Sequence, residues 1–131
     1  MIIAVGTDAI DVARVQRAVD HPQWGARFRA RVFTPAEIAY CLSRRRHAES
    51  FAARFAAKEA VMKALGTGYA RGVIWRDIEV VRDSDAPRLV LYGGAQARAR
   101  ALGIARWHLS LTHTAGQALA HVIAEGALEG T

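Results

Sequence analysis

Two acidic residues and one lysine in this sequence have the chemistry to bind a divalent cation together with a phosphate. Glu59 and Lys63 lie four positions apart in "RFAAKEAVMKALGTG" (residues 54–68), so they share one face of a helix. Asp8 follows the apolar run "IIAV" and Gly6, and we expect it at the carboxyl end of a strand, pointing into a crevice. Two carboxylates suit Mg²⁺, which takes its other ligands from water and substrate phosphates. The three side chains therefore indicate phosphoryl-transfer chemistry on a diphosphate.

Two cationic positions would extend such a site to a second phosphate. Arg54 precedes Lys58 by four positions on another side of the same helix, and His113 ends the alternating stretch "LSLTHTAG". Arg54 and His113 both carry donors for an anion, so they could contact a second phosphate together. Each also has a structural interpretation, because Arg54 and Lys58 could form a solvated helix edge and His113 a solvated turn.

The proposed metal ligands have structural alternatives as well. Glu59 and Lys63 could be an exposed helical ion pair, which contributes about 0.3–0.5 kcal/mol. Asp8 could cap the helix that follows it, as aspartate often does at such positions. Helix geometry alone does not decide between these interpretations and a functional site.

The elements that must position these residues can be read from apolar periodicity and turn residues. Thr34, Pro35 and Glu37 predict a helix start with a capping box. Ser50 is expected to cap the helix that carries Glu59, and Gly66 to end it. We assign no element to residues 24–33. The expected strands are 2–5, 77–83, 88–93, 107–114 and 117–125, with turns at 84–87 and 115–116, and the expected helices are 11–20, 34–43, 50–65 and 95–103.

This order of elements predicts an α+β fold with a largely antiparallel sheet and packed helices. We expect a single domain over residues 1–125, followed by a flexible tail at 126–131. Six alanines fall in one broad sector of helix 50–65, which would allow another backbone to approach it closely.

The composition limits the class of protein further. Apolar residues make up 52% of the chain, enough for a packed core, and 131 residues suit one domain. The net charge of +6 favours anionic partners such as phosphorylated cofactors, acidic proteins or nucleic acid. Cys41 is the only cysteine, which excludes an intramolecular disulfide, and its apolar helical spacing argues against a nucleophile. With no signal peptide and no run of about 20 apolar residues, we expect a cytoplasmic protein that does not enter membranes.

Three blocks of the sequence together resemble the holo-acyl-carrier-protein synthases, the small type of 4′-phosphopantetheinyl transferase. The blocks are "VGTDAIDVARV", "FAARFAAKEAVMKALGTG" and "WHLSLTHTAGQALAHVI", and their order and spacing match that family over almost the whole chain. The middle block is the most specific of the three. Thr7 departs from the apolar residue that many relatives carry there, and residues 44–46 are more basic than the resemblance leads us to expect.

The resemblance implies transfer of the 4′-phosphopantetheine arm of coenzyme A to a serine of apo-acyl carrier protein, with release of adenosine 3′,5′-bisphosphate. It also implies a homotrimer with active sites at subunit interfaces. Asp8 and Glu59 would bind Mg²⁺ and, with Lys63 on the reacting phosphate, would be the catalytic residues. Lys58 belongs to the motif without an assigned role. The residues expected to bind coenzyme A are Arg54, Lys63, Gly66, Thr67, Gly68, His113 and Thr114.

The sequence leaves more than one candidate for the general base and for the role of the basic helix face. A water molecule on the metal, held by Asp8 or Glu59, and Glu59 itself are both candidate bases. Arg14 and Arg17 point away from the apolar face of the first helix, so they are candidates to dock an acidic carrier protein. A merely solvated basic face is the alternative. Whether the carrier serves fatty-acid or polyketide synthesis stays open.

Two other functions would use the same residues. A nucleic-acid-binding domain would explain the basic charge, but the sequence has no recognisable nucleic-acid motif, so we expect no nucleic-acid partner. A Mg²⁺-dependent phosphohydrolase would use Asp8 and Glu59 with water as the acceptor. Release of the bisphosphate without any carrier would distinguish the hydrolase from the transferase.

Overall fold

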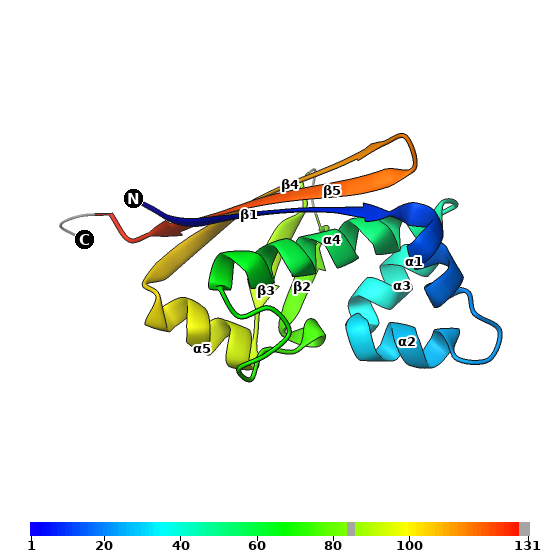
Figure 1. The fold of residues 1–131 in the computed structure, drawn as a ribbon, viewed down its shortest axis with the longest axis horizontal. Coiled ribbons are helices and arrows are strands. Elements are labelled where there is room, and N and C mark those ends of the chain that lie inside the picture. The colour runs from blue at the N-terminus through cyan, green and yellow to red at the C-terminus, as the bar shows by residue number, and fades with distance from the viewer. Residues whose placement is uncertain (84–85, 129–131) are drawn as a thin grey trace.

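The computed structural model describes residues 1–83 and 86–128 and has an α+β fold (Figure 1). The prediction of an α+β class with antiparallel strands is confirmed. A helix that was not predicted, α2, fills most of the segment left unassigned. The elements are β1 (Ile2–Asp11), α1 (Val12–Val19), α2 (Gly25–Val32), α3 (Pro35–Ser43), α4 (His47–Leu65), the 3₁₀ helix η1 (Trp75–Asp77), β2 (Ile78–Val81), β3 (Arg88–Leu91), α5 (Gly93–Ala101), β4 (Ile104–Thr114) and β5 (Gln117–Gly126).

A three-stranded antiparallel sheet and one long helix form the centre of the fold. The strand order is β1-β5-β4, and β2 and β3 form a separate antiparallel pair. Helix α4 runs along one face of the larger sheet, with α1, α2 and α3 gathered at one end and α5 toward the other (Figure 1). In the described part of the chain, no helix is long and apolar enough to cross a membrane.

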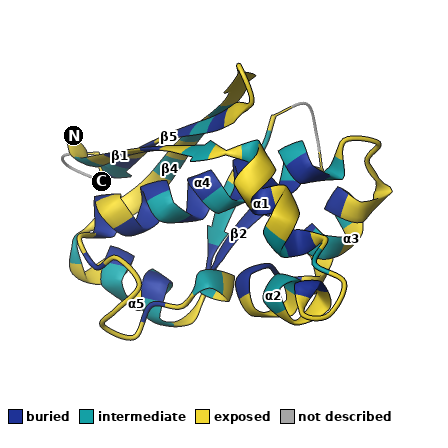
Figure 2. Cartoon of the chain, turned by 45° about the vertical axis from the view of Figure 1, so that its right-hand side comes forward, coloured by how far each residue is buried: buried dark blue, intermediate teal, exposed yellow. Residues whose placement is uncertain are grey.

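Helix α4 packs tightly on the sheet because the residues between them are small. A Cβ atom at Gly6 would lie 2.0 Å from the carbonyl oxygen of Ala60, so only glycine fits where β1 crosses the helix. Alanines of α4 are buried along its length (Figure 2). The expectation that the alanine sector admits another backbone is therefore confirmed.

No helix or strand of the described residues covers the opposite face of the sheet (Figure 1). On β5, Ala120 and Val122 point toward α4 and are buried, whereas the alternate residues His121 and Ile123 are exposed. Val5 on β1 is also 64% exposed. A sheet face with exposed apolar residues is available for contact with another polypeptide.

Strand β1 is longer than predicted, and this changes the position of Asp8. The strand continues past Gly6 to Asp11, so Asp8 lies within it, opposite Ala120 of β5, and not at its carboxyl end. The glycine that suggested a strand end instead makes room for α4. Asp11 takes the capping role considered for Asp8, because its side chain accepts a hydrogen bond from the backbone of α1.

The local helix and turn signals were mostly correct. Thr34 and Glu37 form the predicted capping box of α3, and Gly66 ends α4 in a left-handed conformation with φ 73°. Ala115 and Gly116 form the predicted hairpin turn, with positive φ at both residues. The N-cap prediction for Ser50 was wrong, since α4 begins one turn earlier at His47.

Several element boundaries differ from the predictions. Helix α5 starts at Gly93 and β4 at Ile104, both earlier than expected, whereas β2 and β3 are shorter. Gly126, predicted to start the tail, is the last residue of β5, and its backbone donates to Met1. Parts of the predicted turn (84–85) and tail (129–131) lie outside the described residues.

Candidate active site

The structure brings Asp8, Glu59 and Lys63 together at the contact between β1 and α4. The Lys63 ammonium lies 2.8 Å from Oδ1 of Asp8 and donates a second hydrogen bond, of 2.9 Å, to the carbonyl oxygen of Thr7. Glu59 is one helical turn before Lys63 on the same side of α4. Two carboxylates and one ammonium from distant parts of the sequence therefore meet at one place.

A cavity of about 370 Å³ opens beside these carboxylates. Its polar lining comes from Asp8, Glu59 and Arg14. The rest of its wall is apolar, formed by Ala9, Ile10, Val15, Ala18, Phe28 and Phe55. The cavity can thus hold a ligand with a charged end at the carboxylates and an apolar portion along the aromatic side.

The carboxylates influence each other because they are close and partly removed from solvent. Burial, followed by the neighbouring Asp8 carboxylate, raises the pKa of Glu59, whereas Lys63 and Arg14 act in the opposite direction. The hydrogen bond to Asp8 raises the pKa of Lys63. Part of the Glu59 shift and most of the Lys63 shift come from Asp8, so a cation close to the two carboxylates would be favourable.

The two carboxylates fit a hard cation that is only partly coordinated by the protein. Oδ2 of Asp8 is buried and has no hydrogen-bond partner in the described part of the chain, so it can serve as a metal ligand. Within residues 1–83 and 86–128, no group of three or more His, Cys, Asp or Glu residues could hold a metal. A site with two carboxylates is typical of Mg²⁺ bound together with a phosphorylated substrate.

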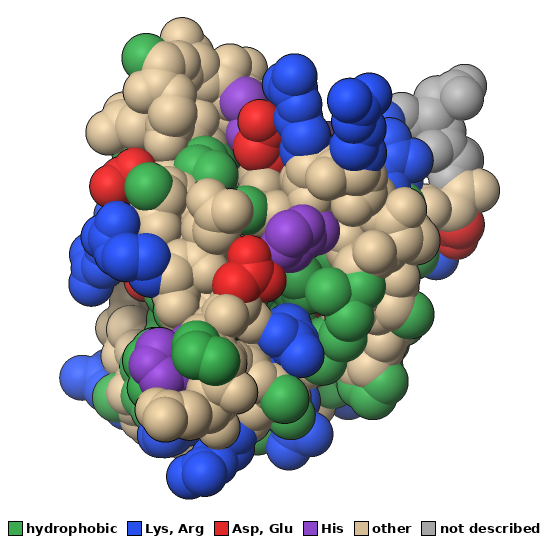
Figure 3. Space-filling model, turned by 90° about the vertical axis from the view of Figure 1, so that its right-hand side faces the viewer, with side chains coloured by type: hydrophobic (Ala, Val, Ile, Leu, Met, Phe, Trp, Pro, Cys, Tyr) green, Lys and Arg blue, Asp and Glu red, His purple; other side chains and the backbone are tan. Residues whose placement is uncertain are grey.

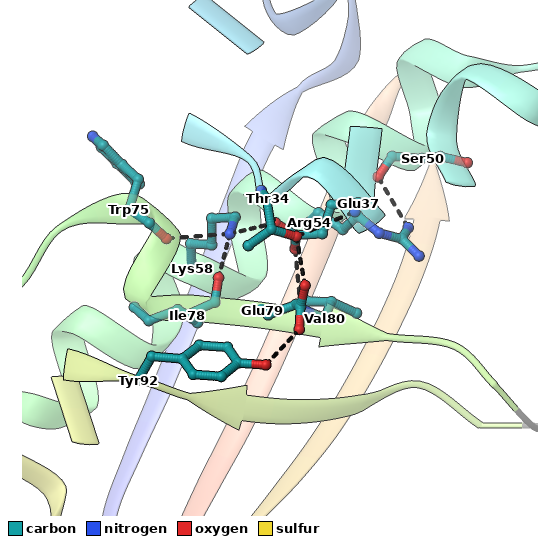
Figure 4. A network of polar contacts seen from close by, with 10 residues as sticks. All are labelled: Thr34, Glu37, Ser50, Arg54, Lys58, Trp75, Ile78, Glu79, Val80 and Tyr92. Atoms are coloured by element: carbon teal, nitrogen blue, oxygen red, sulfur yellow. Dashed lines mark hydrogen bonds and ion pairs between the residues drawn. The ribbon is translucent and has the colours of Figure 1, made fainter. Parts of the chain in front are cut away.

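Arg54 and Lys58 are not a solvated helix edge, so that interpretation was wrong. Arg54 is 4% exposed and its guanidinium lies 4.4 Å from the centre of the Tyr40 ring, while its Nη1 donates to the carbonyl of Ser50. The Nε of Arg54 is buried without a partner. Lys58 is completely buried and forms an ion pair of 2.7 Å with Glu37 (Figure 4).

His113 and Thr114 line different cavities from the carboxylates. His113 borders a basic cavity of about 360 Å³ together with Tyr40, Ser50 and four arginines, Arg44, Arg45, Arg46 and Arg82. Thr114 and His113 both line an adjoining cavity of about 260 Å³. Arg54 contacts Tyr40 and Ser50, so it lies behind the wall of the basic cavity.

The residues predicted to bind coenzyme A thus lie at separate places within one chain. The basic cavity and the Asp8–Glu59 cavity share no lining residue. Gly66, Thr67 and Gly68 follow Lys63 at the end of α4, where the backbone of Thr67 donates to Met62. They do not line the Asp8–Glu59 cavity.

The basic residues of α1 lie beside the carboxylate cavity. Arg14 and Arg17 are both exposed, and Arg14 lines the cavity as well. Lysine and arginine side chains predominate over acidic ones at the end of the molecule formed by α1–α3 (Figure 3). This end is therefore suited to an acidic partner.

Sequence reasoning missed two features near the site. Phe55 lines the cavity one turn before Glu59, although its spacing only suggested ordinary core packing. Glu37 was identified as a capping residue, but not as the ion-pair partner of Lys58. The only sequence signal for this ion pair was a lysine at an otherwise apolar helix position.

Burial raises the pKa of the Cys41 thiol to about 12, which agrees with the expectation that this residue is not a nucleophile.

Comparison with known families identifies the class of protein. The profile of the 4′-phosphopantetheinyl transferase superfamily matches residues 4–120. The chain belongs to this superfamily and, by the relatives that follow, to its holo-[acyl-carrier-protein] synthase family.

The relatives match over nearly the full length of both chains. The holo-[acyl-carrier-protein] synthase of Anaeromyxobacter sp. (strain K) is 55% identical over 127 residues, covering 96% of this chain and 98% of the relative. That of Koribacter versatilis is 48% identical over 126 residues, covering 95% and 99%. The chain is thus an enzyme that carries out phosphopantetheinyl transfer.

Solved structures of this family have the same fold. The holo-[acyl-carrier-protein] synthase of Neisseria meningitidis matches with a TM-score of 0.84 and 32% identity, covering 95% of this chain and 99% of that one. The Helicobacter pylori enzyme, solved in complex with coenzyme A, matches with a TM-score of 0.78 and 29% identity, covering 92% and 99%. The α+β fold is therefore shared with the family.

Proposed function

We propose that this enzyme transfers the 4′-phosphopantetheine group of coenzyme A to a serine of an apo-acyl carrier protein in a Mg²⁺-dependent reaction. The other product is adenosine 3′,5′-bisphosphate. The observation that carries the proposal is that Asp8 and Glu59 line one cavity while Lys63 bonds to Asp8, and that one buried Asp8 oxygen has no partner among the described residues. The Helicobacter pylori relative, solved with coenzyme A, supports the choice of donor.

Charge stabilisation is the main task of these residues. Mg²⁺, held by Asp8 and Glu59, would neutralise charge on the diphosphate when bound. Lys63 contributes a positive group next to the same carboxylates, and its bond to Asp8 holds the ammonium at the cavity. The serine oxygen forms a bond to phosphorus as the bond to the bridging oxygen breaks, so negative charge develops on the leaving bisphosphate. A fixed ammonium beside that charge lowers the barrier.

The proton of the serine hydroxyl must leave as the new bond forms. Glu59 lines the cavity, where the serine of a docked carrier can come within reach of its carboxylate. We assign it the role of general base, acting directly or through one water molecule. Asp8 would share the cation with Glu59 and orients Lys63.

The adenosine end of coenzyme A would bind in the basic cavity of a neighbouring copy. Arg54, His113 and Thr114 lie at or behind this cavity and its neighbour, apart from the carboxylates of their own chain. A homotrimer assembled through the uncovered sheet face would allow one copy to supply the carboxylates and the next the basic cavity. The backbone at Gly66, Thr67 and Gly68 would line the cleft between them.

The carrier protein would dock on α1. Arg14 and Arg17 are exposed beside the cavity, where they can pair with an acidic carrier while its serine reaches Glu59. We place the reaction in the cytoplasm, where coenzyme A and the carrier would both be available.

Intact mass spectrometry tests the proposal directly. The protein is incubated with apo-acyl carrier protein, coenzyme A and Mg²⁺, and the carrier is expected to gain the mass of phosphopantetheine. Carriers of fatty-acid and polyketide synthesis are compared, and chelation of Mg²⁺ should stop the reaction. Unmodified carriers throughout, or release of bisphosphate without a carrier, would contradict the proposal.

A further inference from the structure

Lys58 is a buried cation that the proposed reaction does not use. Its side chain and that of Glu37 have no exposed surface, and Lys58 Nζ lies 2.7 Å from Oε1 of Glu37. The same Nζ donates to the carbonyl of Trp75, at 3.2 Å, and to that of Ile78 (Figure 4). The three donors of the ammonium therefore each have an acceptor.

Glu37 extends this network to the backbone at two further positions. Its Oε1 accepts the backbone N–H of Thr34 and its Oε2 accepts that of Val80 (Figure 4). The ion pair consequently connects α3, α4, η1 and β2. Burial lowers the pKa of Lys58, and the Glu37 carboxylate opposes that shift.

Stability alone does not account for such a pair. A buried ion pair is often no more stabilising than well-packed apolar residues of similar volume. What an ammonium adds is a fixed geometry, because it holds the carbonyls of Trp75 and Ile78 at defined positions relative to α4. The network is thus suited to fix the chain that leads into β2.

Trp75, whose carbonyl accepts a hydrogen bond from Lys58, also contacts the wall of the carboxylate cavity. The Trp75 indole is stacked between two rings: the Phe55 centroid is 5.0 Å away with an interplanar angle of 24°, and that of Tyr69 is 5.3 Å away at 22°. Phe55 lines the cavity with Asp8 and Glu59. A continuous chain of contacts therefore runs from Glu37 and Lys58 through Trp75 to the cavity.

We propose that Lys58 is a positioning residue for this cavity, which it serves by holding Trp75 behind Phe55. With the carbonyl of Trp75 fixed, the indole supports the Phe55 ring and keeps it in the cavity wall. Without the ammonium, the carbonyl loses its donor and the indole can move, so the wall loses its support. The inference rests on the proposed function, since it treats this cavity as the place where substrate binds.

The expected effect is on substrate binding rather than on the chemical step. Lys58 does not contact Asp8, Glu59 or Lys63. Turnover at saturating substrate should therefore change less than about 3-fold in Lys58→Met. The KM for the carrier protein should rise about 10-fold, the pattern of a lost binding contact.

Tryptophan fluorescence provides a readout that mere destabilisation would not move. In a Trp24→Phe/Trp107→Phe background, Trp75 is the only tryptophan, and acrylamide quenching measures its accessibility. Lys58→Met should increase that quenching at temperatures where the protein is fully folded. The matched control is Ile104→Ala, which weakens core packing at the start of β4 but removes no ring of the stack and no partner of Lys58, and should alter neither quenching nor KM.

A second variant tests whether Lys58 acts through Trp75. Trp75→Leu leaves the Lys58–Glu37 pair in place and should raise the KM for the carrier to a similar extent. The double variant Lys58→Met/Trp75→Leu should be no worse than Trp75→Leu, because both changes remove the same support. If Lys58→Met does not fold, the KM of Trp75→Leu decides, and a KM equal to that of the parent overturns the proposal.

Three outcomes would refute the positioning role. They are unchanged quenching in a folded Lys58→Met protein, multiplicative effects on KM in the double variant, and a loss confined to kcat. Failure of the proposed function can be told apart from failure of the positioning role, because the parent protein would then transfer no phosphopantetheine to any carrier. Quenching of Trp75 still reports on the contact in that case, and an unchanged value would refute it independently.

Discussion

The ammonium of Lys63 lies 2.8 Å from Oδ1 of Asp8, although the two residues are 55 positions apart in the sequence. The Lys63 side chain is 55% exposed and that of Asp8 only 10%. Exposed ion pairs contribute at most about 1 kcal/mol to stability, so this one does little to hold β1 to α4. Its consequence is positional: it places a positive group next to the carboxylates that we assign to Mg²⁺.

Replacement of Lys63 should therefore affect activity much more than stability. In Lys63→Met, we expect turnover to fall about 10²–10³-fold, the loss typical of removing one group that stabilises developing charge. The free energy of unfolding should change by no more than about 1 kcal/mol. Steady-state kinetics and thermal unfolding measure the two effects.

The control for Lys63 is another exposed ion pair. Arg88 lies 2.9 Å from Asp83, and both side chains are more than half exposed. Arg88→Met should have a similarly small effect on unfolding and none on turnover. Equal turnover in the Lys63 and Arg88 variants would contradict the assignment of Lys63.

Lys63 should also set the acid limit of activity. Glu59 must be ionised to accept a proton, and Lys63 lowers its pKa against the raising effects of burial and Asp8. In Lys63→Met the pKa of Glu59 should rise further, so the acid limb of the kcat/KM profile should move to higher pH. If the acid limb of the kcat/KM profile lies at the same pH in Lys63→Met and in the wild type, Glu59 is not the group that titrates there.

Glu59→Gln should stabilise the protein when no divalent cation is present. The pKa of Glu59 is raised in the folded state, so its contribution to stability is present below its ordinary pKa and is lost as pH rises through the folded pKa. Glutamine stays neutral throughout. The melting temperature of the variant should therefore exceed that of the wild type by a growing margin as the pH rises from the ordinary pKa of glutamate through its raised pKa in the folded state.

Addition of Mg²⁺ should reverse this order. The wild type should gain stability from the cation, whereas Glu59→Gln should gain little and should lose Mg²⁺-dependent transfer. Asp83→Asn removes an exposed carboxylate outside the cavity and should respond to Mg²⁺ as the wild type does. Near-normal turnover of Glu59→Gln would refute its role in catalysis.

Charge reversal on α1 should weaken docking of the carrier protein. Arg14→Glu and Arg17→Glu should each raise the KM for the carrier about 10-fold at low salt and reduce the dependence of KM on salt, since exposed charges act through screened attraction. Arg100→Glu on α5 changes the net charge equally and should leave KM unchanged. Equal effects of all three would indicate a general response to net charge.

A complementation experiment tests whether neighbouring copies share a site. Asp8→Asn and His113→Ala should each be nearly inactive alone. If one copy supplies Asp8 and the next supplies His113, each mixed trimer should regain one of its three sites, which is about one quarter of all sites in a random 1:1 mixture. The proteins are unfolded together, refolded and assayed, and no recovery would place both residues in the site of a single chain.

Much of the local structure follows from the sequence alone. The capping box at Thr34 and Glu37, the left-handed end at Gly66 and the hairpin turn at Ala115–Gly116 depend on neighbouring residues and on backbone sterics, so each was predictable. The i, i+4 spacing of Glu59 and Lys63 likewise determined that they share a helix face.

The contacts across the fold could not be obtained in this way, because they depend on which surfaces pack together. Gly6 suggested a strand end, but it is required where β1 touches Ala60, and Asp8 therefore lies within the strand. Lys58 and Arg54 look like exposed cations on a helical wheel, yet packing of α3 against α4 buries both.

The sequence by itself indicated the family, most of the elements in their order and the residues with the chemistry for phosphoryl transfer. Tertiary structure decided that Asp8 and Glu59 share one cavity with Lys63 bonded to Asp8, and that His113 lies at another cavity. The physical reason is that residue types and short spacings specify local geometry and available chemistry. Only the burial of side chains between distant elements determines which charges meet and which become part of the core.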